Sequence, residues 1–233
     1  IISGGINPSS NFTPSAAPFG TTLPSYVSGG QVVFTMVDTT QLQLSPYGVT
    51  PYIIGSASVA TQDSNVSVYY PGTTSYLNFP TSNPINFDIN TSNIFVETWV
   101  YITTSLAGGM CQIGVPGGVA ILGSYTSSGN FYLETTGGAA IVSKSGVPNP
   151  GWCHLAASYY YTGSAYRIMC WVNGSPAVAP TSTTKLNYLT SYALTPGFYI
   201  GTTSRAFYMR DFRVIQGGVI QTTSFTPSTA PFT

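Results

Sequence analysis

Short apolar runs, separated by clusters of Gly, Pro, Ser and Asn, recur along the whole chain. Val, Ile, Tyr, Phe and Thr dominate these runs, and helix signals are nearly absent. Short strands between such turn residues are typical of sandwiches and barrels. We expect strands at 31–38, 50–60, 66–70, 75–79, 94–103, 109–113, 119–124, 130–134, 138–143, 152–161, 166–173, 197–201 and 206–215.

One hairpin is predicted in detail, with its turn centred on Gly163 and Ser164. A turn with this centre pairs Leu155 with Val172 across the two strands. One face is then apolar and is predicted to be core, with Cys153, Leu155, Ala157 and Tyr159 opposite Ile168, Cys170 and Val172. The other face is interpreted as the outer one, with Trp152, His154, Ala156, Ser158 and Tyr160 opposite Arg167, Met169, Trp171 and Asn173.

The two ends of the chain carry the same motif. Residues 12–19 read FTPSAAPF and residues 225–232 read FTPSTAPF, and ten of twenty positions are identical when 1–20 is aligned with 214–233. A period near 213 indicates whole domains in series rather than a solenoid. We expect 1–20 to be the end of a preceding repeat or an N-terminal linker arm, 21–224 the sandwich, and 225–233 a Pro-rich linker to a following unit. We expect the linker side chains Phe12, Phe19, Phe225 and Phe232 to insert into adjoining domains.

Composition narrows the possible partners. Only 5% of the 233 residues are charged, and six basic residues balance six acidic ones. Six scattered Lys and Arg do not make a phosphate-binding surface, so nucleic acid is excluded as a partner. No apolar run reaches the length of a membrane span, about 18 residues. So little charge suits a surface that is glycosylated or packs against copies of itself.

Three cysteines do not make a disulfide scaffold. On the predicted register Cys153 and Cys170 lie too far apart for a disulfide, so we interpret both as buried thiols. Pairing of either with Cys111 stays open. Four sequons are glycosylation candidates unless they arise by chance in a chain rich in Asn, Ser and Thr, and they start at Asn11, Asn65, Asn90 and Asn173.

Five segments in order resemble a known family. SVYYPGTTSYLNFP (67–80), IFVETWVYI (94–102), GWCHLAASYY (151–160), YRIMCWVNG (166–174) and the ending FYIG (198–201) with MRDFRVIQGG (209–218) are similar to motifs of laminin-G-like, concanavalin A-like domains, including those of phage and large-virus virion proteins. The resemblance implies an all-β, two-sheet antiparallel jelly-roll sandwich used for adhesion, decoration or assembly. Where the family often has two acids in its closing strand, this chain has Arg210 and Asp211, which puts a calcium site there in doubt.

The sequence gives little support for a catalytic site. A retaining glycosidase needs two carboxylates about 5 Å apart, but the neighbours of Glu97 on its strand face are Phe95 and Trp99. We interpret Glu97 as an acceptor for a backbone or Arg group. The sole histidine, His154, has no partner for a zinc cluster and is interpreted as a packed strand residue. We expect no cofactor, with a weak calcium site using Asp63 or Asp88 left open.

The remaining candidates for binding are aromatic. His154, Tyr160 and Trp171 lie on the predicted outer face, and we expect that face either to stack on a glycan or to meet another sheet layer, a neighbouring domain or an identical subunit. The leading hypothesis is therefore a non-enzymatic structural domain of an extracellular fibre, appendage or virion surface, in a tandem array that contacts its own copies. The alternative is a carbohydrate-binding adhesin module. A hydrolase dependent on Glu97 is the weakest hypothesis.

Overall fold

The computed structural model describes residues 23–28, 30–36, 52–71, 76–78, 93–103, 108–109, 124–125, 129–134, 141–183, 197–198, 206–220 and 223–229. All regular elements in these ranges are β-strands. In the same ranges no helix has the length and apolar character that a membrane crossing requires.

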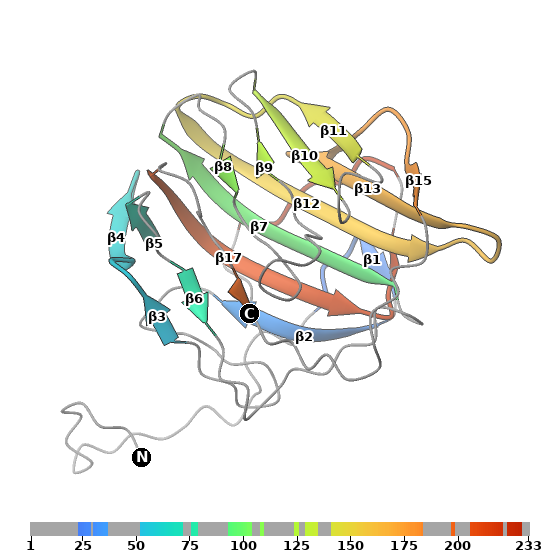
Figure 1. The fold of residues 1–233 in the computed structure, drawn as a ribbon, viewed down its shortest axis with the longest axis horizontal. Coiled ribbons are helices and arrows are strands. Elements are labelled where there is room, and N and C mark those ends of the chain that lie inside the picture. Colours follow the sequence, from blue (N-terminus) through green and yellow to red (C-terminus); the bar gives the residue numbers. More distant parts are fainter. Residues whose placement is uncertain are drawn as a thin grey trace, which may run out of the picture.

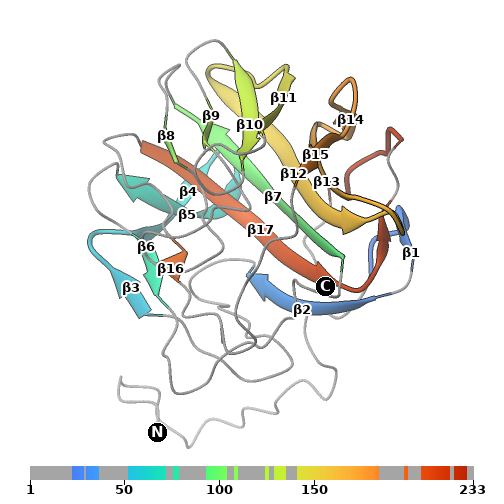
Figure 2. The same cartoon turned by 45° about the vertical axis from the view of Figure 1, so that its right-hand side comes forward.

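Nine strands form the largest sheet (Figures 1 and 2). They are β2 (Gln31–Met36), β4 (Ser58–Gln62), β5 (Asn65–Pro71), β7 (Ile94–Ile102), β12 (Gly151–Tyr161), β13 (Tyr166–Val172), β14 (Ser175–Pro176), β15 (Thr181–Thr183) and β17 (Ala206–Gln216). Their order is β14-β13-β12-β7-β17-β5-β4, with β15 beside β13 and β2 beside β17. The long strands β12, β7 and β17 run side by side through the centre of the molecule.

Smaller sheets complete the fold. The four-stranded sheet has the order β11 (Ile141–Ser145), β10 (Asn130–Glu134), β9 (Ser124–Tyr125), β8 (Gly108–Gly109). A three-stranded sheet contains β16 (Gly197–Phe198), β6 (Tyr76–Asn78) and β3 (Tyr52–Ile54), and β1 (Val27–Ser28) pairs with β18 (Val219–Ile220). All the pairings between described strands are antiparallel. The chain is therefore an all-β jelly-roll sandwich, as predicted.

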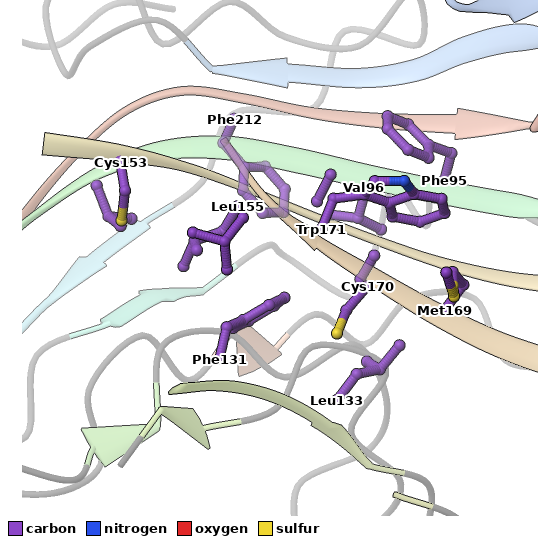
Figure 3. Packing of buried hydrophobic residues seen from close by; sticks show 14 of the residues in the cluster. Phe95, Val96, Phe131, Leu133, Cys153, Leu155, Met169, Cys170, Trp171 and Phe212 are labelled. Carbon is purple, nitrogen blue, oxygen red and sulfur yellow. The ribbon is translucent and has the colours of Figure 1, made fainter. Parts of the chain in front are cut away.

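The core lies between the large sheet and the four-stranded sheet (Figure 3). Phe131 and Leu133 of β10 point toward Leu155 and Cys170 of the large sheet. Leu155 is 1% exposed and Val172 is 3% exposed, so the face predicted to be core is buried. This interdigitation of two inner faces is the usual packing of a sandwich.

The predicted hairpin has the predicted register. Leu155 pairs with Val172 and Tyr159 with Ile168. The loop is closed by a bond from Thr162 N to Ala165 O of 3.0 Å. The next turn, between β13 and β14, has positive φ at both central residues, Asn173 (50°) and Gly174 (72°), which is the type I′ geometry that suits a two-residue hairpin.

Other strand predictions need correction or are only partly covered. The single strand expected at 50–60 is two strands, β3 and β4, because the chain bends at Gly55, where φ is 84°. Strand β11 continues to Ser145, two residues beyond the expected end at 143, and residues 138–140 lie outside the described residues. Most of the strands expected at 109–113 and 119–124 lie outside the described residues.

Candidate functional site

The second face of the large sheet carries an unusual row of side chains. Alternate residues of β7 point to it, namely Phe95, Glu97, Trp99 and Tyr101. Ala156, His154 and Trp152 of β12 pair with the last three of these in turn, so they share the face. This face was predicted to be the outer one. Part of it is covered and part is not, and the two parts differ in chemistry.

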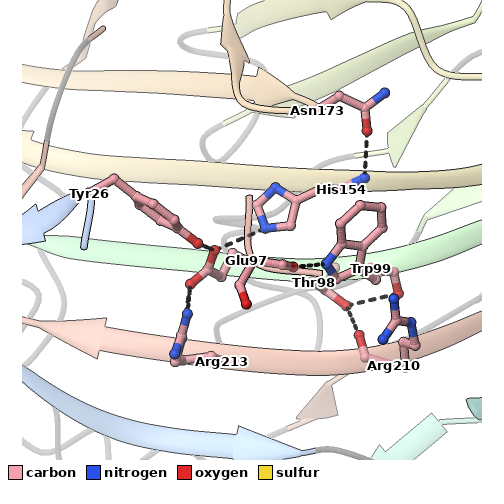
Figure 4. A network of polar contacts seen from close by, with 9 residues as sticks. Tyr26, Glu97, Thr98, Trp99, His154, Asn173, Arg210 and Arg213 are labelled. Carbon is pink, nitrogen blue, oxygen red and sulfur yellow. Dashed lines mark hydrogen bonds and ion pairs between the residues drawn. The ribbon is translucent and has the colours of Figure 1, made fainter. Parts of the chain in front are cut away.

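The covered part holds a buried polar network around Glu97 (Figure 4). Arg213 Nε donates to Glu97 Oε1 at 2.9 Å. His154 Nε2 lies 2.9 Å from Glu97 Oε2, and Tyr26 OH donates to the same oxygen. Because an ionised carboxylate only accepts, His154 donates through Nε2–H. The interpretation of Glu97 as an acceptor for an Arg group is confirmed.

The network keeps the Glu97 carboxylate ionised although it is buried. Burial alone would raise its pKa, but the hydrogen bond from His154, the charge of Arg213 and the bond from Tyr26 together hold that pKa below its usual value. Burial and the Glu97 charge raise the pKa of the Tyr26 hydroxyl, which therefore stays protonated as a donor. With its oxygens occupied by these donors, the carboxylate is placed to hold β7, β12 and β17 together.

A C-terminal segment, residues 223–229, covers this network, and we call it the strap. It crosses the strands from β13 to β7. Trp171 Nε1 donates to Thr223 O at 3.2 Å, Phe225 N to Gly174 O at 3.0 Å, and Trp99 Nε1 to Ser228 O at 2.9 Å.

The strap is anchored by the Phe225 ring. That ring stacks on Tyr26 with centroids 4.0 Å apart. It also contacts His154 (5.8 Å), Trp171 (6.1 Å) and Phe95 (6.4 Å). The expectation that Phe225 inserts into an adjoining domain is thus corrected, because its ring packs on this chain's own sheet. Phe12, Phe19 and Phe232 lie outside the described residues.

The strap also corrects the predicted outer face. His154 and Trp171 are 0% exposed, and the Phe225 ring packs against both of them. They are core residues rather than surface contacts. Tyr160 is partly exposed and packs against the edge of the core. Burial raises its pKa, and the charge of Arg167 partly offsets that shift.

The uncovered part of the same face is an aromatic patch. We define the patch as the partly exposed side chains of Tyr69, Trp99, Tyr101, Trp152, Tyr208 and Arg210. They come from β12, β7, β17 and β5, which lie side by side in the sheet in that order. Four strands therefore bring together residues that lie far apart in the sequence.

The rings of the patch contact one another edge to face or tilted. Tyr69 and Tyr208 have centroids 4.7 Å apart, Tyr101 and Tyr208 6.0 Å, and Tyr101 and Trp152 5.6 Å. Arg210 sits among them, its guanidinium 5.4 Å from the ring centroids of both Trp99 and Trp152. Such contacts hold the rings in fixed orientations.

The charge of Arg210 is balanced locally. Its Nη1 lies 2.7 Å from Oδ2 of Asp211, a residue that is 1% exposed, while the Arg210 side chain is 13% exposed. The patch is thus aromatic and polar but carries no net charge.

The other candidates are not brought together. Asp63 is an exposed turn residue with φ 48°, and Asp88 lies outside the described residues. No group of three or more His, Cys, Asp and Glu side chains suited to a metal occurs in the ranges that the structure covers. Cys153 and Cys170 are free and buried, as predicted, while Cys111 falls outside these ranges.

Two of the four sequons can be examined. Asn65 Nδ2 donates to Asp63 O at 2.9 Å, and Asn173 Oδ1 accepts from His154 N at 2.9 Å. Asn173 is exposed and Asn65 partly so. Asn11 and Asn90 lie outside the described residues, and glycosylation stays a prediction at all four.

Sequence reasoning missed most of the patch. It placed Trp152 on the correct face but did not single out Tyr69, Tyr101 or Tyr208, and it considered Arg210 only in connection with a calcium site. The alternation in IFVETWVYI was a usable signal, since it puts Trp99 and Tyr101 on one face. The positions of β5 and β17 beside β7 could not be obtained from local pattern.

Fold and patch define a class, a β-sandwich with a solvent-accessible aromatic sheet face. The binding domain of Paraclostridial Mosquitocidal Protein 1 has a similar structure, with a TM-score of 0.50 and 9% identity over 84% of this chain and 49% of that one. The botulinum neurotoxin serotype D binding domain gives 0.49 and 10% over 84% and 48%. Domain 4 of AbnA, an extracellular GH43 arabinanase of Geobacillus stearothermophilus solved with arabinotriose, gives 0.42 and 14% over 84% and 95%.

These likenesses concern the fold. The chain spans about half the length of the two toxin binding domains. No family model matches the sequence, and no curated protein matches it either. The resemblance to laminin-G-like and virion domains and the tandem repeat stay predictions.

Proposed function

We propose that this chain is an extracellular carbohydrate-binding module that holds a neutral glycan on the aromatic patch. The observation that carries this is the cluster of partly exposed rings from Tyr69, Tyr101, Trp152 and Tyr208 on one sheet face. Aromatic faces suit the apolar C–H faces of sugar rings, and phenol hydroxyls suit sugar hydroxyls. A few polar groups among apolar rings are the usual composition of a binding site.

The local charge favours a neutral ligand. Asp211 neutralises Arg210 at 2.7 Å, and Trp99 and Trp152 flank the guanidinium. An anionic sugar would have to compete with Asp211 for the arginine, whereas a neutral sugar needs only hydrogen bonds. The chain as a whole has no net charge, which agrees with a ligand that is not steered by electrostatics.

The fold gives this proposal a context without carrying it. The similar structures include binding domains of toxins and a domain solved with arabinotriose, which belongs to an extracellular enzyme. Identities of 9–14% support the shared fold alone. The choice of glycan as ligand therefore depends on the patch.

A glycan array followed by titration calorimetry tests the proposal. We expect Trp152→Ala and Tyr208→Ala each to weaken binding about tenfold, because each removes ring area that the sugar would bury, at about 25 cal/mol per Å². The matched control is Tyr161→Ala, because Tyr161 is also an accessible tyrosine, 49% exposed, but lies at the hairpin end of β12. Equal losses for Tyr161→Ala and Tyr208→Ala, or no binding by the folded wild type, would reject the patch as a glycan site.

A structural role in an array is the second candidate. The observation that favours it is the duplicated ending, with seven of eight positions identical between 12–19 and 225–232. Concentration-dependent filament growth without glycan binding would support assembly over adhesion.

A further inference from the structure

The strap is bound mainly through groups that a second segment of this chain also has. Three of its hydrogen bonds involve main-chain atoms of the strap, namely Thr223 O, Phe225 N and Ser228 O. Any peptide with the same backbone path can make them. The side chain that anchors the strap is the Phe225 ring.

Residues 12–15 contain the same phenylalanine and the same succession of main-chain groups. They read Phe-Thr-Pro-Ser, as do residues 225–228, so Phe12 corresponds to Phe225 and Ser15 to Ser228. The match continues upstream, where Ile2 and Gly4 correspond to Ile215 and Gly217. In the structure Ile215 is buried at the end of β17 and Gly217 has φ 79°. The duplication thus preserves the residues that the fold uses.

The sheet is shaped to receive a main chain at this place. Gly174 has φ 72°, and a Cβ on it would lie 1.8 Å from Phe225 O. Close approach of the strap therefore requires glycine there. Beside it, Tyr26, Trp171, His154 and Phe95 surround the phenylalanine ring.

We propose that the strap site on the sheet face also accepts residues 12–19 of a second copy when the resident strap, residues 223–229, leaves it. The motif is then a closing segment exchanged between copies rather than a linker, and Phe12 occupies the ring site of Phe225. Six residues lie between Phe19 and Tyr26, which makes seven Cα-to-Cα steps, and Tyr26 lies beside the strap site of its own copy. Seven such steps span at most about 25 Å, so the two copies would lie in close contact.

This inference is independent of glycan binding, and it specifies a contact for the assembly role. Within one copy the strap of residues 223–229 competes with the incoming segment. A tethered segment has an effective concentration in the millimolar range, so exchange in the wild type is suppressed. Weakening the resident strap should expose the site.

The test uses the full chain and a labelled peptide of residues 10–20. Fluorescence anisotropy should show saturable binding to the Phe225→Ala chain, at least tenfold tighter than to the wild type. A peptide with Phe12→Ala should bind the Phe225→Ala chain at least tenfold more weakly. No saturable binding to the folded Phe225→Ala chain, or equal binding of both peptides, overturns the inference.

A second design covers a Phe225→Ala chain that fails to fold. This design keeps Phe225 and adds a protease site between Gln221 and Thr222. The site is cut after the chain has folded, so that only noncovalent contacts hold the strap in place. A hundredfold excess of the 10–20 peptide should release the strap fragment on gel filtration, and the Phe12→Ala peptide should not. Retention of the fragment in both cases overturns the inference. Filament growth by the cut chain under conditions where the peptide does not release the strap would show that assembly uses a contact other than the strap site.

Discussion

Arg213 reaches Glu97 because β17 contains one residue more than β7 between two of their pairings. Arg210 pairs with Trp99 and Arg213 with Glu97, so three steps on β17 match two on β7. Asp211, with φ 54°, takes up the extra residue as a β-bulge. Without the bulge Phe212 would stand opposite Glu97, leaving the carboxylate without its cation. The bulge also turns Phe212 into the core, where it is 2% exposed.

Glu97→Gln should therefore destabilise the sandwich strongly. The substitution leaves the Arg213 charge buried without its counter-ion, a change that typically costs 3–5 kcal/mol. We expect the free energy of unfolding in urea at pH 7 to fall by about 3 kcal/mol. The control is Glu134→Gln on β10, a partly exposed acid, which should change stability by less than about 0.5 kcal/mol. Similar losses for both variants would contradict a special role of the buried pair.

The same pair predicts a loss of stability in acid. The pKa of Glu97 is lower in the folded chain than its usual value of 4.5. The unfolded chain therefore binds a proton first, so this contribution to stability is complete above about pH 4.5 and is lost as the pH falls through the folded pKa. Urea unfolding at a series of pH values should show the gap between wild type and Glu97→Gln narrowing below pH 4.5. A gap that stays constant down to pH 3 would be inconsistent with this ionisation.

Substitutions at two glycines distinguish the cost of a collision with the strap from the cost of backbone strain. Gly174 and Gly163 both have positive φ, 72° and 91°, but only at Gly174 would a Cβ collide with the strap, since nothing lies within 4 Å at Gly163. Gly163→Ala should cost only the strain of the left-handed region, about 1–2 kcal/mol. Gly174→Ala should cost more and release the strap. Hydrogen exchange checks this, because amides of 223–229 should lose protection in Gly174→Ala and keep it in Gly163→Ala.

The two core thiols should be inert in the folded protein. Burial raises the pKa of Cys153 and of Cys170 to about 12. At pH 8 a pKa of about 12 leaves about one thiol in ten thousand ionised, and thiolate is the reactive form. In a Cys111→Ser chain, a thiol reagent should titrate no cysteine without denaturant and two with it. Rapid reaction of the native variant would mean that the hairpin face opens to solvent.

The local sequence pattern was sufficient to predict the hairpin of β12 and β13. It was not sufficient to predict which residues cover the second face of that hairpin. Alternation and a short turn determine the pairing of Leu155 with Val172, because a slip of one residue would expose that apolar face. The second face looked like an outer one, with His154 and Trp171 among polar neighbours. Its cover comes from Tyr26 and Phe225, which are distant in sequence and adjacent only in the folded chain.

The site was harder to predict for the same reason. Tyr69, Tyr101 and Tyr208 become neighbours through pairings of β5 with β17 and of β17 with β7. Nothing in the spacing of three tyrosines in separate strands reveals that order. The bulge at Asp211 is equally hidden, since Arg210 and Asp211 read as two ordinary strand residues.

Binding of a neutral glycan to the patch should be insensitive to salt. Exposed charges are screened over about 8 Å at physiological ionic strength, so affinity for an anionic ligand falls as salt rises. Arg210 is paired with Asp211 and is flanked by Trp99 and Trp152, which leaves ring stacking and hydroxyl hydrogen bonds as the main contributions. Tryptophan fluorescence titrations with the array-selected glycan should give dissociation constants within about twofold between about 50 and 500 mM NaCl. A tenfold weakening over that range would show that Arg210 binds an anionic group, and an acidic sugar would replace the neutral one as the ligand of this face.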